Sequence, residues 1–158
     1  MSTVRLADYL AEDHLFWDLS APDKDSLLRA MAARIVSHQP GVDADMLLDL
    51  LLQREAVQST GIGDGLALPH AMVPGTETTA LYVGRVTPAV EYEALDDAPV
   101  DLVFLLLSPS DGLKQHVRLL ARVARIIGQS DLLDRLRVAA RVEDAYGILL
   151  DEDSRHVY

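Results

Sequence analysis

The sequence predicts an α/β protein in which a mixed β-sheet carries helices on both of its faces. Short apolar runs of strand length alternate with longer runs whose apolar residues recur at helical spacing, and this alternation is typical of α/β domains. The run at residues 100–107, VDLVFLLL, is almost continuously apolar, as in a strand buried on both faces. A chain of 158 residues, 49% of them hydrophobic, has the size and the apolar content of one domain.

The first part of the chain supplies a strand and two helices. In order, we expect a helical turn at residues 6–10, a strand at 15–19, and helices at about 20–38 and 43–55. Residues 20–23 resemble a capping box, with Pro22 near the first helical position, and the Gln-Pro-Gly sequence at 39–41 ends that helix. His14 and His38 fall near element ends, and we interpret both as surface residues.

Arg54 is the polar residue of interest in the second helix, which Asp43 opens. The apolar face of this helix carries Leu47, Leu50 and Leu51. Arg54 continues that row, so it is predicted on or beside the inward face, at the end that leads into a glycine-rich segment. A structural role also fits this position, because an arginine there can extend its stem to solvent or stabilise the helix C-terminus electrostatically.

Residues 59–70, STGIGDGLALPH, form the most informative stretch of the chain. Glycines at three alternate positions permit positive φ and a close approach of the backbone to another group. Residues 66–68 are predicted to form a short buried strand, which Pro69 ends. His70 is then expected at the mouth of a glycine loop beside a strand end, where open α/β sheets bind ligands. By spacing alone it is equally an ordinary loop histidine, and the segment matches neither a P-loop nor a GxGxxG dinucleotide motif.

The second half of the chain contains the central strand and three helices. In order, we expect a loop at residues 72–79, a strand at 80–86, an acidic connection at 88–99, the central strand at 100–107, and helices at about 113–127, 132–138 and 142–150. In the first of these helices, Arg118, Arg122 and Arg125 are expected to form a solvated stripe. His116 lies in its first turn on the buried side, where a histidine usually satisfies its hydrogen bonds within the core.

Composition excludes several classes of function. A net charge of −11 argues against nonspecific nucleic-acid binding and favours electrostatic steering of a basic partner. No apolar run approaches the ~18 residues of a membrane span, no signal-peptide pattern is present, and there is no cysteine for disulfide or thiolate chemistry. We therefore expect a cytoplasmic protein, with a single domain over residues 1–158, a core at about 6–150 and a frayed polar tail at 151–158.

The segment STGIGDGLALPHA resembles the phosphorylation-site motif of the fructose/mannitol-type enzyme IIA domains of the bacterial phosphotransferase system. The resemblance extends over about residues 6–150. The segments TPAVEYEALDDAPVDLVFLLLSP and DRLRVA are most similar to the nitrogen-regulatory branch, which is a single soluble domain. The resemblance implies the same layered sheet, with His70 as the phosphoryl acceptor. One position departs from the family pattern, because Met72 stands where a lysine or arginine is usual.

Further expectations follow from this resemblance. It implies that Arg54 lines the phosphohistidine pocket and that His116 faces the phosphorylated histidine. An HPr-like phosphocarrier is the implied phosphoryl donor, and ion transporters or sensor kinases are implied as regulated targets. No cofactor or metal is expected, because a phosphohistidine donor needs no Mg²⁺. We expect Met72 on the rim where the carrier docks, and its alternative place is as a filler of the core.

The chemistry of a phosphoryl carrier sets the requirements for the site. The acceptor must be neutral at working pH and later a fair leaving group, and histidine imidazole, with an ordinary pKa of about 6.5, meets both needs. Phosphoryl transfer has a loose transition state with charge on the equatorial oxygens, so catalysis is mostly positioning and electrostatic stabilisation. The candidate donors to those oxygens are the Thr60 hydroxyl, the backbone amides of Gly61 and Gly63, the Arg54 guanidinium and the His116 imidazole.

Three classes of function remain open at this point. The first is a phosphocarrier, either regulatory or a sugar-transport IIA subunit that passes its phosphate to a IIB domain. The second is a regulatory binding module that does not transfer phosphate, and Met72 is the feature that supports it. The third is an unrelated enzyme, such as a histidine-dependent hydrolase or a two-histidine metal site, for which the sequence offers no cysteine and no suitably placed third histidine.

Overall fold

The protein is built on a six-stranded mixed sheet, seen here in a computed structural model that describes residues 4–128 and 131–156. The strand order is β1-β5-β6-β3-β2, and β4 also pairs with β6. β5 and β6 are antiparallel, whereas β1, β3 and β4 each pair in parallel with a neighbour. The strands are β1 (Leu15–Leu19), β2 (Gly61–Gly63), β3 (Leu66–Ala67), β4 (His70–Met72), β5 (Ala80–Val90) and β6 (Val100–Ser108).

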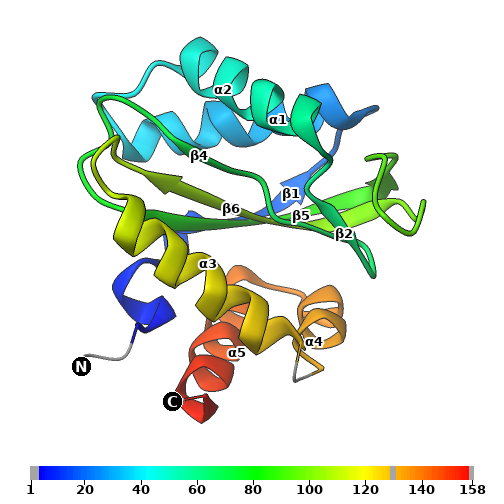
Figure 1. Cartoon of the computed structure of the whole chain (residues 1–158). Helices are drawn as coiled ribbons and strands as arrows, with labels where there is room; N and C mark the ends of the chain where they lie inside the picture. The colour runs from blue at the N-terminus through cyan, green and yellow to red at the C-terminus, as the bar shows by residue number, and fades with distance from the viewer. Residues whose placement is uncertain (1–3, 129–130, 157–158) are drawn as a thin grey trace.

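Helices cover both faces of this sheet, which confirms the predicted α/β class (Figure 1). α1 and α2 lie on one face, and α3, α4 and α5 lie on the other. Over the described ranges, none of the helices has both the length and the apolar character needed to cross a bilayer. The α-helices are α1 (Lys24–Ile35), α2 (Ala44–Val57), α3 (Leu113–Gly128), α4 (Leu132–Val138) and α5 (Val142–Arg155), and three 3₁₀ turns are η1 (Leu6–Asp8), η2 (Glu12–His14) and η3 (Val36–His38).

The central strand β6 explains why its sequence is apolar without alternation. Successive side chains of a strand point to opposite faces of the sheet, and here both faces are covered. Val103, Leu105 and Leu107 pack under α1 and α2. Leu102, Phe104 and Leu106 pack under α3, α4 and α5. β6 therefore contributes side chains to the hydrophobic cores on both faces of the sheet. The neighbouring strands β3, β4 and β5 are all positioned by pairing with it.

Local sequence signals predicted the start of α2 correctly, but they placed the start of α1 a few residues too early. Asp43 caps α2 as predicted, because its carboxylate accepts a hydrogen bond of 2.9 Å from the amide of Met46. The box at residues 20–23 does not form. Asp23 itself is the cap of α1 and accepts a 2.8 Å hydrogen bond from the amide of Ser26. β5 also continues to Val90, past the predicted strand end, by shifting its register against β6.

The expectation of a frayed tail was wrong for residues 151–155. α5 continues to Arg155, and Asp153 is buried against α3. Its carboxylate pairs with Arg122 at 3.0 Å and accepts a 2.9 Å hydrogen bond from the amide of Leu6. Arg122 is therefore buried as well, which corrects the predicted solvated stripe. The sequence indicated that Arg122 and Asp153 lie at the surface, because the two members of the ion pair are 31 positions apart in the chain. Residues 157–158 lie outside the described part.

We expect Asp153→Ala to lower the free energy of unfolding by about 3–5 kcal/mol, because removing one member of a buried ion pair leaves the other charge uncompensated. The side chains of Arg122 and Asp153 are only 5% and 3% exposed. Urea denaturation followed by circular dichroism measures the effect. The matched control is Asp151→Ala in the same helix, where the carboxylate is 48% exposed and its pairs contribute at most about 1 kcal/mol. Equal losses in the two variants would contradict the prediction.

Candidate functional site

His70 is the first residue of β4, whereas the sequence had placed it at the mouth of a glycine loop. β3 and β4 pair one after the other with the same edge of β6, and Pro69 lies between them. Pro69 has no amide hydrogen, so it interrupts the ladder, but its carbonyl still accepts a 3.0 Å hydrogen bond from the amide of Leu106. The interruption therefore ends β3 without detaching the chain, and His70 is held against the central strand.

Two hydrogen bonds orient the His70 ring. Nδ1 lies 3.0 Å from the carbonyl oxygen of Leu68, and since a carbonyl can only accept, Nδ1 carries the proton. Nε2 then holds the lone pair and lies 3.4 Å from Nε of Arg54. Arg54 is itself held at the end of α2, because its Nη1 donates to the carbonyl of Gln58 at 3.0 Å. The site thus presents a neutral, nucleophilic nitrogen directly beside a fixed cation.

His116 faces His70 from the first turn of α3, with the two ring centroids 5.3 Å apart. Its Nδ1 lies 2.7 Å from the Ser108 hydroxyl, which in turn accepts a hydrogen bond from Thr79. Because Ser108 already accepts one hydrogen bond, this arrangement favours donation of its own proton to Nδ1, and the proton of the His116 ring then lies on Nε2. Burial, and then the nearby His70, lower the pKa of His116 to about 4, which keeps the ring neutral at pH 7.

Ser108 and Thr79 are residues that the sequence did not single out. Ser108 was visible only as the end of an apolar run, and Thr79 only as the end of a loop. Both become significant because β5 and β6 are antiparallel, which brings the start of one strand beside the end of the other. Together they determine which nitrogen of His116 can donate.

A depression of about 540 Å³ contains these side chains and opens between the end of α2 and the start of α3. Figure 1 shows β4 running between these two helices. Arg54, His70, His116 and Met72 all line it, and Met72 is partly exposed there. Leu113 and Val117 add an apolar margin on α3, at 60% and 54% exposure. A small group of polar atoms is thus surrounded by an apolar surface on which another protein could dock.

The structure corrects the expectation that Thr60, Gly61 and Gly63 belong to this site. None of the three lines the depression around His70. A side chain at Gly61 would collide with Ala94, so that glycine allows close packing of two chain segments. Gly63 has a φ of +110° in the β2–β3 hairpin and faces Asp96. The glycines therefore build a hairpin at the other end of β3.

Thr60 has a structural role in a buried cluster. Its hydroxyl donates to one carboxylate oxygen of Glu55, and its amide donates to the other at 3.0 Å. Lys24 pairs with the same carboxylate at 2.9 Å, and the Tyr92 hydroxyl lies 3.2 Å from the Thr60 hydroxyl. Burial raises the pKa of Tyr92. The Thr60 carbonyl then accepts the amide of Leu68, so this cluster supports the segment that orients His70. Glu55 gave no signal in the sequence beyond its charge.

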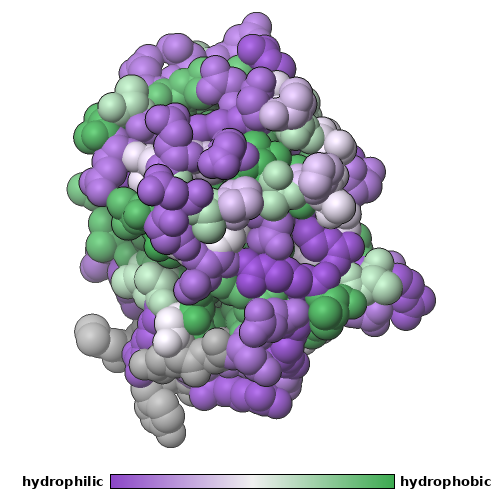
Figure 2. All heavy atoms as spheres, turned by 90° about the vertical axis from the view of Figure 1, so that its right-hand side faces the viewer, coloured by the Kyte–Doolittle hydropathy of each residue, from purple (hydrophilic) through white to green (hydrophobic). Residues whose placement is uncertain are grey.

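A second depression, of about 660 Å³, lies between the β2–β3 hairpin and the end of α3. Of the predicted site residues only Gly63 lines it, beside Asp64, Asp134 and Arg137. Arg137 pairs there with Asp101 at 2.9 Å. Figure 2 views the molecule from the hairpin side, and hydrophilic residues predominate on that face with hydrophobic ones in separate patches. The cation of this depression, Arg137, is paired with carboxylates, whereas Arg54 in the site around His70 contacts a ring nitrogen and a backbone carbonyl.

The fold and the site define a class of protein: an α/β domain in which one histidine ring lies beside both a guanidinium and a second, neutral imidazole. Residues 8–152 match the family described as phosphoenolpyruvate-dependent sugar phosphotransferase system, EIIA 2. A nitrogen regulatory protein of Pseudomonas aeruginosa is 33% identical over 148 residues, which are 94% of this chain and 96% of that protein. The chain therefore belongs to the EIIA 2 family, and this membership supports a IIA-type phosphocarrier.

Solved structures agree with this assignment. The crystal structure of nitrogen regulatory protein IIA-Ntr from Neisseria meningitidis superposes with a TM-score of 0.83 at 25% identity, covering 90% of this chain and 97% of that one. The mannitol IIA structure from Escherichia coli superposes with a TM-score of 0.74 at 17% identity, covering 89% and 98%. The second likeness is one of fold alone. The predicted layered mixed sheet is thus confirmed.

Proposed function

We propose that this chain accepts a phosphoryl group on Nε2 of His70 from the phosphohistidine of an HPr-like carrier protein, and that it acts in the cytoplasm mainly as a regulator of other proteins. One observation carries the proposal. The Nδ1 proton of His70 is held by the Leu68 carbonyl, while the Nε2 lone pair faces Arg54. A ring oriented in this way presents its nucleophile where a guanidinium can meet the incoming phosphate.

In the proposed transfer, the Nε2 lone pair of His70 attacks phosphorus in line with the phosphorus–nitrogen bond of the donor. That bond breaks, its electron pair returns to the imidazole of the carrier, and a new phosphorus–nitrogen bond forms on Nε2. The Nδ1 proton stays on His70 throughout, hydrogen-bonded to the Leu68 carbonyl. Arg54 and the Nε2 proton of His116 are placed to donate to the equatorial oxygens, where charge is spread in the transition state.

Two further features support the choice of partner and role. The apolar margin formed by Leu113 and Val117 suits a carrier that docks through an apolar patch. The net charge of −11 steers such a carrier if it is basic around its histidine. The regulatory role rests on the relatives, which are named nitrogen regulatory proteins.

The experiment that tests this function is reconstitution. The protein is incubated with enzyme I, an HPr-like carrier and phosphoenolpyruvate, and intact mass spectrometry follows one acid-labile phosphate per chain. A parallel reaction without the carrier distinguishes transfer through the carrier from direct phosphorylation by enzyme I. Failure to label with a carrier that phosphorylates another IIA protein in the same assay would reject the proposal.

Met72 favours a second candidate, a regulatory binding module that does not transfer phosphate. It lines the depression around His70 and is partly exposed, at a position where the resemblance to the family implies a positive charge. We expect Met72→Lys to change the apparent affinity for the phosphocarrier more than the transfer rate at saturation, because Arg54 still meets the phosphate. Steady-state transfer kinetics over a range of carrier concentrations separate the two parameters.

The matched control for this variant is Met46→Lys, since Met46 is a methionine with an exposed side chain at the end of α2 opposite to Arg54. That control should leave both parameters unchanged. If Met72→Lys raises the saturating rate tenfold or more, the missing charge is catalytic and the natural chain is an impaired carrier. The binding module would then become the preferred function.

A further inference from the structure

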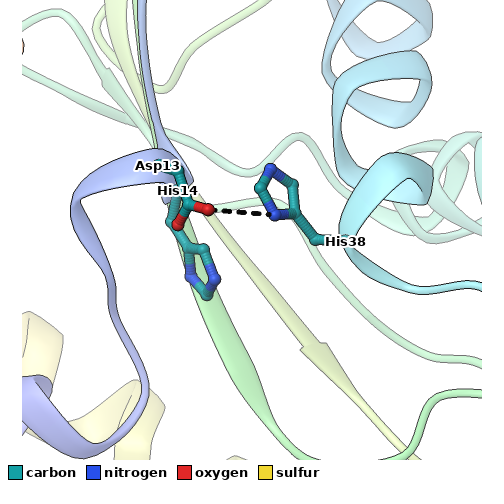
Figure 3. Close-up of side chains that lie close together, drawn as sticks. All are labelled: Asp13, His14 and His38. Carbon is teal, nitrogen blue, oxygen red and sulfur yellow. Dashed lines mark ion pairs between the residues drawn. The ribbon is translucent and has the colours of Figure 1, made fainter.

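A cluster of metal-binding residue types, Asp13, His14 and His38, lies close together away from the His70 site (Figure 3). Asp13 and His14 end η2, just before β1, whereas His38 ends η3, just after α1. Each residue offers one ligand atom, and the three atoms lie within 4.8 Å of one another. The Asp13 carboxylate and Nδ1 of His38 are 3.7 Å apart. The sequence interpretation of both histidines as plain surface residues was wrong, because both are partly buried.

Contacts around His14 fix the orientation of its ring in the way that is usual for metal-binding histidines. Nδ1 lies 2.9 Å from the carbonyl oxygen of Leu81, so it carries the proton and Nε2 keeps the lone pair. Such a backbone carbonyl on the second ring nitrogen fixes the tautomer and the ring orientation of metal-ligating histidines. The ring also stacks on Tyr82 with centroids 4.4 Å apart, and the His38 ring meets it edge-on at 5.4 Å.

We propose that Asp13, His14 and His38 bind a divalent cation of the zinc class. Two imidazoles and one carboxylate are a ligand set that suits Zn²⁺ and its transition-metal neighbours, whereas Mg²⁺ and Ca²⁺ require mainly oxygen ligands. Ligand atoms up to 4.8 Å apart must approach by about 1 Å or more to share an ion at Zn–N distances near 2.0–2.1 Å. The Asp13 side chain is 72% exposed and can make that movement.

A cation at this position would join the segment that enters β1 to the segment that leaves α1. These segments are far apart in the sequence, and binding there stabilises only the folded chain. The site therefore supplies a link between metal availability and the stability of the sheet edge at β1. It is separate from the phosphoryl-transfer chemistry and does not depend on the proposed function.

The test is titration of the full chain with Zn²⁺ by isothermal calorimetry, with Co²⁺ absorption as a reporter of ligand geometry. We expect one bound ion, a higher Tm with Zn²⁺, and no competition from excess Mg²⁺. His38→Gln removes one ligand and Asp13→Asn weakens another, and roughly a tenfold to hundredfold loss of affinity or more is expected in each. These two residues are chosen because the His14 ring packs on Tyr82.

Two histidine controls give the experiment its specificity. His70→Gln disrupts the other close pair of imidazoles, and His156→Gln removes a histidine that contacts Glu152 at 3.0 Å. Both variants should bind Zn²⁺ as the natural chain does. Unchanged affinity in both His38→Gln and Asp13→Asn, or loss of binding in His70→Gln, overturns the proposal. Circular dichroism without metal confirms that each variant is folded, and if His38→Gln is not, Asp13→Asn alone decides.

Discussion

Replacement of His70 by alanine is expected to abolish phosphoryl labelling of the protein while leaving it folded. The proposed acceptor atom is Nε2 of this ring, and the second imidazole at the site, that of His116, is buried with Nδ1 committed to Ser108. His70 is itself only partly buried at the start of β4, so its loss removes little core packing. Intact mass after reconstitution measures the label, and far-UV circular dichroism with Tm measures the fold.

The matched control for that experiment is His156→Ala, which removes another partly buried histidine, one at the end of α5. It should label as fully as the natural chain. Normal labelling of His70→Ala would show that another residue accepts the phosphate and would remove the basis of the proposed function. Labelling on Nδ1 in the natural chain, detected by the chemical shift of the phosphohistidine, would contradict the ring orientation described here.

We expect Arg54→Gln to lower the transfer rate at saturating carrier by about 10²- to 10³-fold, the scale on which loss of one charge-stabilising donor acts in other enzymes. The effect of losing Arg54 is expected to be large here, because Met72 supplies no positive charge to the same depression. The natural nucleophile remains, so slow labelling of His70 should persist. Rapid-quench measurement of a single transfer from the phosphorylated carrier separates this rate from docking.

Arg54→Lys is the informative companion variant. It keeps the charge but loses the planar donor fork, so a rate between those of Arg54→Gln and the natural chain is expected. Arg34→Gln serves as the control for removing a positive charge, because Arg34 pairs with Asp18 on the exposed face of α1. If Arg54→Gln transfers phosphate at the natural rate, the guanidinium only stabilises the C-terminal end of α2 through its hydrogen bond to Gln58. That is the structural alternative raised by the sequence.

Sequence reasoning succeeded where the signal was local. The cap at Asp43, the buried run of β6 and the helical phase of Arg54 and His116 depend on residues within one or two turns, and the structure places all four accordingly. In each of these cases, the spacing of neighbours along one element determines the direction of a side chain. His70 was singled out in another way, by the resemblance of its motif to a known phosphorylation site, because spacing alone left it an ordinary loop histidine.

The sequence by itself thus predicted the α/β class, the central strand and the presence of His70, Arg54 and His116 at the candidate site. Tertiary structure decided the rest. Only the fold shows that Thr60 is committed to Glu55, that Arg122 has a partner in the last helix, and that β3 and β4 divide one edge of β6. The physical reason is the same for each. A buried polar group takes whichever partner the fold brings to it, and that partner does not depend on distance along the chain.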